Sequence, residues 1–180
     1  MGSSKILLHA CCAVCAAYPL ELLKEDGFEP VVYFFNPNIY PYDEYQRRLN
    51  ELIRYSDKKQ FELIIDKSGF EAWHEAVKGL ENEPERGLRC LKCFEYRLNA
   101  AAKKACSLGI DKITSTLTVS PYKNSKNVIE TGKNAAEAVK IEYLEYDFKK
   151  KNGFLKTMDI ARQENFYRQT YCGCKYSIRT

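Results

Sequence analysis

Six cysteines in three tight pairs carry the clearest chemical signal in this sequence of 180 residues. The pairs stand near the start, the middle and the end of the chain: Cys11 with Cys12, Cys90 with Cys93, and Cys172 with Cys174. Thiolate sulfur is the ligand that zinc and iron–sulfur clusters accept most readily. If the fold gathers even two of these pairs, the sequence predicts a soft-metal site.

The three pairs differ in what their spacing allows. Cys90 and Cys93, three residues apart at the start of a predicted helix, share one helix face, and the helix N-terminus favours the thiolate form. The adjacent Cys11 and Cys12 are expected to point in different directions, which suits separate corners of a cluster better than one tetrahedral ion. The pair around Gly173 leaves two alternatives, metal ligation or cycling between dithiol and disulfide.

Two further cysteines have weaker signals. Cys15 follows the first pair by three residues, so it either faces the metal or packs against the sheet. Cys106 continues an apolar stripe through Phe94, Leu98 and Ala102, which predicts a place in the core.

The elements that must position these cysteines alternate between strand and helix. Lys5 to His9 is a predicted buried strand that leads into Cys11, and the next helix ends near Gly27, with Pro19 expected in its first turn. Further strands are predicted at 31–35, 61–65, 113–117 and 141–146, and helices over 42–58, 89–109 and 128–139. This alternation predicts a single α/β domain over residues 1–180, a Rossmann-like parallel sheet of about five strands with helices on both faces. Ligands of such sheets bind beyond the carboxyl ends of the strands.

Composition narrows the class of protein. An apolar content of 45% provides a core that needs no disulfide framework, so the eight cysteines are expected to be reduced and the protein cytoplasmic. No apolar run approaches the roughly 20 residues of a membrane span, and no membrane association is expected. A net charge of +4 permits a polyanionic partner without requiring one.

Polar residues follow the predicted strands at the edge where a ligand would bind. His9 ends the first strand and is either a proton donor or a hydrogen-bonded residue that orients the site. The segment 118–124 either offers hydroxyls, an amide and an ammonium to a ligand or forms a turn and helix cap on Ser120 and Pro121. Lys149 to Lys151 is read as a solvated face, with phosphate contact as the alternative.

Motifs along nearly the whole chain resemble the cobalamin-independent epoxyqueuosine reductases. They are Leu7–Cys15, Asn36–Pro41, Arg89–Cys93, Arg97–Leu98, Ser120–Asn124, Asp147–Lys150, Tyr167–Gln169 and Tyr171–Cys174. Two departures are Val14, where the family usually has proline, and Tyr122, where it usually has histidine.

The resemblance implies an oxidoreductase with a nucleotide-hydrolase-like fold that removes the epoxide oxygen from epoxyqueuosine in tRNA. It implies a 4Fe-4S cluster on Cys11, Cys12, Cys90 and Cys93 and a second iron beside it. Cys172 and Cys174 would bind that iron or relay electrons, and His9 is a candidate proton donor.

The same resemblance implies two macromolecular partners, the anticodon loop of tRNA and an external electron-donor protein. Lys and Arg would contact phosphates, and aromatic rings would stack on bases. The residues expected to contact substrate are Asn36, Asn38, Tyr40, Lys123, Asn124 and Arg168.

Of two rival functions, the sequence leaves the first open and argues against the second. The cysteine pairs could be closed zinc sites of a structural RNA-binding protein, although a domain of this size needs no zinc to fold. An ATP-using relative of the tRNA-thiolating enzymes would carry a glycine- and serine-rich phosphate loop where His9 to Cys12 stand.

Overall fold

Five parallel strands form the single sheet of the computed structural model, which describes residues 4–178. The strands are β1 (Ser4–His9), β2 (Phe28–Phe35), β3 (Leu63–Asp66), β4 (Lys112–Ser115) and β5 (Glu142–Tyr143). Their order across the sheet is β3-β2-β1-β4-β5, and every neighbouring pair is parallel. The predicted Rossmann-like α/β architecture is confirmed.

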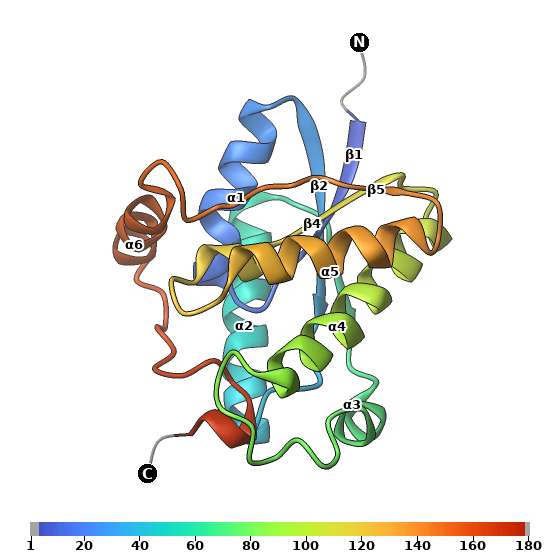
Figure 1. Cartoon of the computed structure of the whole chain (residues 1–180). Helices are drawn as coiled ribbons and strands as arrows, with labels where there is room; N and C mark the ends of the chain where they lie inside the picture. Colours follow the sequence, from blue (N-terminus) through green and yellow to red (C-terminus); the bar gives the residue numbers. More distant parts are fainter. Residues whose placement is uncertain (1–3, 179–180) are drawn as a thin grey trace.

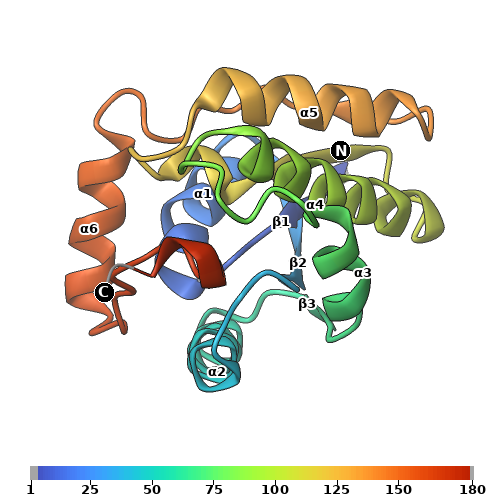
Figure 2. The same ribbon diagram turned by 60° about the horizontal axis from the view of Figure 1, so that its bottom comes forward.

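Helices cover both faces of this sheet (Figures 1 and 2). They are α1 (Ala13–Glu25), α2 (Tyr42–Lys59), α3 (Phe70–Ala76), α4 (Leu88–Ser107), α5 (Ser125–Glu137) and α6 (Gly153–Gln163). Ile6 and Leu8 of β1 pack in one core with α1, α2 and α6, while Leu7 packs in the other with α4 and α5. Because side chains alternate along a strand, a strand buried on both faces is apolar at successive positions. None of the described helices is long and apolar enough to cross a membrane.

The topology places the cysteine loop at the centre of one edge. The chain runs from β1 outward to β2 and β3, then returns across β1 to β4 and β5, so the direction reverses between β1 and β4. Parallel sheets of this type bind ligands in the crevice at that reversal. Cys11 and Cys12 follow β1 directly, and a short 3₁₀ helix (Thr116–Val119) follows β4 beside them.

Several elements differ from the sequence prediction. Pro19 lies well inside α1, because that helix begins at Ala13, immediately after the cysteine pair. β4 ends at Ser115, where the Ser115 hydroxyl accepts from the Leu117 N–H and turns the chain into the 3₁₀ helix. Helices α3 and α6 were not predicted. Cys106 is exposed, so its predicted place in the core is wrong.

Candidate metal centre

Three thiols converge at the start of α1. The sulfur atoms of Cys11, Cys12 and Cys15 all lie within 4.8 Å of one another, and those of Cys11 and Cys12 are 3.8 Å apart. Cys12 is the N-cap of α1, and its sulfur accepts the Cys15 N–H at 3.4 Å. The expected divergence of the adjacent cysteines is therefore wrong: the cap turns the Cys12 side chain back over the first helical turn, toward Cys11.

The electrostatics of this trio favour one ready thiolate. Hydrogen bonds from Cys12 and then Cys15 hold the pKa of Cys11 well below its usual range, and the charges of Arg97 and Lys123 act in the same direction. The pKa of Cys12 is raised to about 12, first by its hydrogen bond to Cys11, and that of Cys15 is raised for the same reason. A second or third thiolate in this buried site needs a cation to join it.

Four other cysteines line one cavity next to this loop. Cys90 and Cys93 come from the first turns of α4, and Cys172 and Cys174 come from the C-terminal segment. Burial is the main cause that raises the pKa of Cys90, and neighbouring Cys172 and Cys93 raise it further. The structure thus brings the second and third predicted pairs together.

The two groups of cysteines remain distinct. Among the described residues, Cys90 and Cys93 are not part of the group whose donor atoms lie within 4.8 Å of one another. Arg97 and Lys123 connect the two groups, since both line the cavity and both act on the charge of Cys11.

Arg97 is a buried cation directed at this cavity. Its side chain is 3% exposed, and one terminal nitrogen donates to Asn36 Oδ1 at 2.5 Å. Among the described residues its Nε has no hydrogen-bond partner, and no carboxylate is paired with it. A buried guanidinium without a carboxylate calls for negative charge in the adjoining cavity.

His9 is held by both ring nitrogens. Its Nε2 donates to the Phe35 carbonyl at 3.2 Å, so its Nδ1, 2.9 Å from the Ser115 hydroxyl, accepts. Burial, followed by the charge of Arg97, lowers the pKa of His9 to about 3. This neutral, fully bonded imidazole favours the orienting role over proton donation.

The predicted substrate residues fall into different environments. Asn36 is fully buried; its amide nitrogen donates to the Ala10 carbonyl, and its amide oxygen accepts from Arg97. These bonds give it a structural role. Asn124 caps α5 through its side-chain oxygen, whereas one of the two alternatives from the sequence placed the cap on Ser120 and Pro121. The predicted contacts that line the cavity are Asn38, Lys123 and Asn124; Tyr40 and Arg168 are exposed outside that lining.

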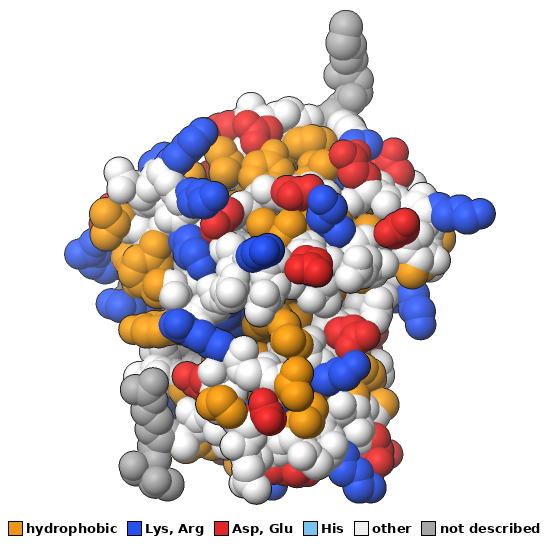
Figure 3. Space-filling view, in the orientation of Figure 1, with side chains coloured by type: hydrophobic (Ala, Val, Ile, Leu, Met, Phe, Trp, Pro, Cys, Tyr) orange, Lys and Arg blue, Asp and Glu red, His pale blue; other side chains and the backbone are white. Residues whose placement is uncertain are grey.

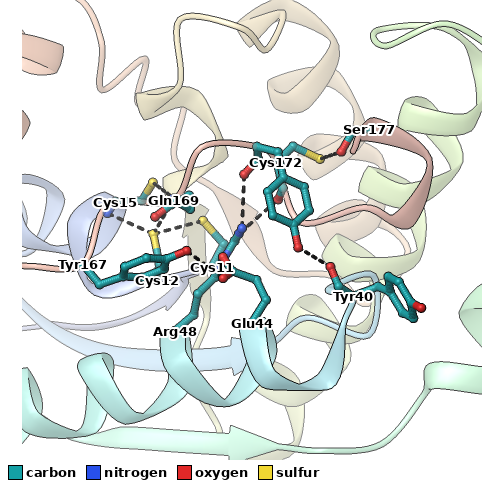
Figure 4. A network of polar contacts seen from close by, with 11 residues as sticks. Cys11, Cys12, Cys15, Tyr40, Glu44, Arg48, Tyr167, Gln169, Cys172 and Ser177 are labelled. Carbon is teal, nitrogen blue, oxygen red and sulfur yellow. Dashed lines mark hydrogen bonds and ion pairs between the residues drawn. The ribbon is translucent and has the colours of Figure 1, made fainter. Parts of the chain in front are cut away.

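A buried ion pair on α2 fastens the C-terminal segment to that helix (Figure 4). Arg48 is 1% exposed; its Nε donates to Glu44 at 2.7 Å, and its terminal nitrogens donate to the carbonyls of Tyr171 and Cys172, each at 3.1 Å. From the same segment, Gln169 Nε2 donates to the Cys12 sulfur at 3.1 Å. We call Glu44 and Arg48 the clamp pair.

Comparison with known proteins decides the family. A family model described as "Epoxyqueuosine reductase QueH" matches residues 6–180. The chain is 39% identical to the epoxyqueuosine reductase QueH of Acinetobacter baylyi, over 99% of this chain and 82% of that protein. It is 38% identical to that of Histophilus somni, over 99% and 74% of the two chains, respectively. The chain belongs to the epoxyqueuosine reductase QueH family.

In this family member, sequence reasoning missed the roles of two arginines. Arg97 lies four residues after Cys93 and seven after Cys90, so helical spacing alone places it on the face that carries both thiols. Arg48 lies four residues after Glu44, which predicts the ion pair. Nothing in that spacing indicates the two carbonyls it binds more than 120 residues away.

The donor set fits an iron–sulfur group. Seven sulfur atoms face one edge of the sheet from three segments, and thiolate is the usual ligand of such clusters. The unpaired Nε of Arg97 and the ammonium of Lys123 supply positive charge opposite the negative charge that thiolates and inorganic sulfide would bring.

Proposed function

We propose that this chain reduces epoxyqueuosine at the wobble position of tRNA to queuosine. The reaction takes up two electrons and two protons, breaks both C–O bonds of the epoxide and releases the oxygen as water, leaving a carbon–carbon double bond. The observation that carries the proposal is the convergence of Cys11, Cys12 and Cys15 within 4.8 Å at the ligand-binding edge of the sheet. The relatives that match nearly the whole chain are named epoxyqueuosine reductase.

In this proposal Cys11, Cys12, Cys90 and Cys93 hold a 4Fe-4S cluster. Cys172 and Cys174 either hold a second iron or cycle between dithiol and disulfide, and the closeness of Cys15 makes it a further candidate ligand. These groups would supply electrons singly and Lewis acidity at the epoxide oxygen.

The positively charged residues of the cavity stabilise the negative charge that develops on the substrate during the reaction. Arg97 and Lys123 line it together with the second and third cysteine pairs, so they face negative charge that develops on the substrate oxygen as the first C–O bond breaks. His9 orients the end of β1 through Ser115 and Phe35. An external donor protein delivers the electrons, and the enzyme works in the cytoplasm, where tRNA is modified and thiols stay reduced.

One anaerobic experiment tests this function. Protein purified without oxygen is analysed for iron, zinc and acid-labile sulfide, then incubated with epoxyqueuosine tRNA and a chemical reductant. We expect iron and sulfide together, and a nucleoside lighter by one oxygen in digests of the tRNA. Zinc without sulfide, with unchanged tRNA, would instead favour the structural zinc protein.

A further inference from the structure

Two loops meet at the mouth of the cavity that holds Cys90 and Cys172. The loop before α4 contributes Arg86, and the loop before α5 contributes Tyr122; both residues line the cavity. Arg86 Nε donates to the Tyr122 carbonyl at 2.8 Å, and the Arg86 N–H donates to the Cys90 sulfur at 3.3 Å. The mouth is thus tied to a predicted metal ligand.

Tyr122 presents a ring to solvent from an ordered backbone. Its side chain is 71% exposed, the largest exposed fraction among the big apolar side chains described. Its N–H donates to the Ser120 hydroxyl at 3.3 Å, and its carbonyl is held by Arg86. These two hydrogen bonds anchor the backbone of Tyr122, so its exposed ring is available at a defined place to stack on a flat, apolar ligand.

A second exposed tyrosine lies across the cysteine loop from the first. Tyr40 follows β2 and Tyr122 follows β4, and these strands flank β1 on opposite sides. Tyr40 is 49% exposed, and its N–H donates to the Gly173 carbonyl at 2.8 Å, between the two C-terminal cysteines. Figure 4 shows Tyr40 at the edge of the polar network around the clamp pair, and the Tyr171 hydroxyl donates to its carbonyl.

The charge at this mouth is positive. The cavity lining contains four cationic side chains, those of Arg86, Arg89, Arg97 and Lys123, against the single carboxylate of Glu85. Lys149 extends the positive charge, because its ammonium donates to the Lys123 carbonyl at 2.6 Å. On the other side, the Lys175 ammonium lies 5.9 Å from the centre of the Tyr40 ring.

Cationic and hydrophobic side chains also lie together elsewhere on the surface. On the face shown in Figure 3, Lys and Arg side chains gather with hydrophobic ones on the side that carries α6. Phosphates pair with such cations, and unstacked bases pair with exposed rings. Protein partners that dock on cationic surfaces supply carboxylates and do not require a projecting ring face, so the pattern fits single-stranded nucleic acid best.

We propose that Tyr122, whose backbone carbonyl is held by Arg86, is a stacking platform for a base that flanks the reacting nucleotide of a single-stranded RNA loop. Tyr40 offers a second ring on the opposite side of the cysteine loop. The proposal rests on the proposed function and deepens it by naming the residues that bind the RNA.

The test measures RNA binding separately from turnover. Iron-loaded protein prepared without oxygen is titrated into a fluorescently labelled RNA hairpin with a single-stranded anticodon loop, and into a fully paired duplex as the comparison. Loss of one stacked base is expected to weaken hairpin binding roughly 10-fold in Tyr122→Ala. Tyr122→Phe and Tyr122→Trp keep a ring and should bind within about twofold of the unaltered protein.

Leu108→Ala is the matched control, because Leu108 is also exposed, at 46%, but lies at the far end of α4. Leu108→Ala should leave the affinity for the hairpin unchanged. The affinity for the duplex should be the same for all the variants and for the unaltered protein. Thermal unfolding of Tyr122→Ala should match that of the unaltered protein, since the removed ring is mostly in water. These results together would support the platform.

The failures of the two proposals differ. If Tyr122→Ala binds the hairpin as tightly as Tyr122→Phe, or loses hairpin and duplex binding equally, the platform is wrong even when the unaltered enzyme reduces epoxyqueuosine. If the unaltered enzyme binds the hairpin through Tyr122 but leaves epoxyqueuosine intact, the platform stands and the proposed reaction fails.

Discussion

Removing the guanidinium of Arg48 should release the C-terminal cysteines while leaving the sheet folded. Arg48 is 1% exposed and Glu44 is 7% exposed, and the guanidinium also holds the carbonyls of Tyr171 and Cys172. Breaking a buried pair on one side costs about 3–5 kcal/mol, because the remaining charge is left uncompensated. The hydrogen bonds that Arg48 makes go to Glu44 on α2 and to the carbonyls of this segment, so we expect the cost to appear as local opening of residues 167–174.

The local opening of residues 167–174 can be measured as the rate at which their thiols are alkylated. A cost of about 4 kcal/mol changes a local opening equilibrium by roughly three orders of magnitude. In anaerobic, reduced protein that has not been loaded with iron, Arg48→Met should therefore greatly accelerate alkylation of Cys172 and Cys174, measured peptide by peptide. Exposed Cys106 provides an internal reference whose rate should not change.

Two variants sharpen the measurement. Arg47→Met removes the neighbouring arginine, which is exposed and whose guanidinium carbon lies 4.7 Å from the centre of the Tyr167 ring, so it should change the rate little. Glu44→Gln removes the ion pair but keeps both hydrogen bonds from Arg48 to the carbonyls. Its alkylation rate should therefore fall between the rates of the two arginine variants. Equal alkylation of Cys172 in Arg48→Met and Arg47→Met would refute the clamp.

Three other substitutions have defined outcomes. Cys90→Ser should lose visible absorbance, iron and sulfide together in anaerobic preparations; full retention of all three would remove Cys90 from the ligand set. Cys106→Ala should stay active and alter the free energy of unfolding by less than about 0.5 kcal/mol, and an inactive folded variant would reveal a role for this exposed thiol. Gly173→Ala should cost more than about 1 kcal/mol, seen as a lower unfolding midpoint, because φ is +105° and a Cβ would lie 3.0 Å from Arg48 Nη1. An unchanged midpoint would contradict that close approach.

The sheet and its ligand-binding edge were predictable because burial on both faces leaves uninterrupted apolar strands. Ile6, Leu7 and Leu8 are all fully buried, and this run identifies β1 without knowledge of any contact. The position of the cysteines at the end of β1 follows directly. Local pattern therefore predicted where the site is.

The same kind of reasoning failed for Cys106 for a geometric reason. Residues spaced four apart in the sequence are rotated by about 40° around the helix axis at each step. Cys106 is three such steps from Phe94 and therefore lies about 120° away from it. The buried face instead shifts to Ala101 and Ala105. Pro19 was expected in the first helical turn, because proline is tolerated there. The helix begins earlier, at Ala13, since Cys12 is its N-cap, and the sequence pattern does not reveal that cap.

The contacts that complete the site could not be predicted, since their partners are remote in the chain. Gln169 reaches the Cys12 sulfur across 157 residues, and Arg48 reaches Cys172 across 124. Neither spacing nor hydropathy carries information about such pairs. The convergence of Cys11 with Cys12 was also hidden, because it depends on one capping conformation at Cys12.

The 157-residue separation between Gln169 and Cys12 also sets an order of events during synthesis. At 5–20 residues per second, a ribosome needs roughly 8–30 s to make the chain between them. During that interval β1 and the first cysteines exist without the segment that later covers them. The first cysteines of the nascent protein are therefore exposed before the C-terminal segment that carries Gln169 has been made.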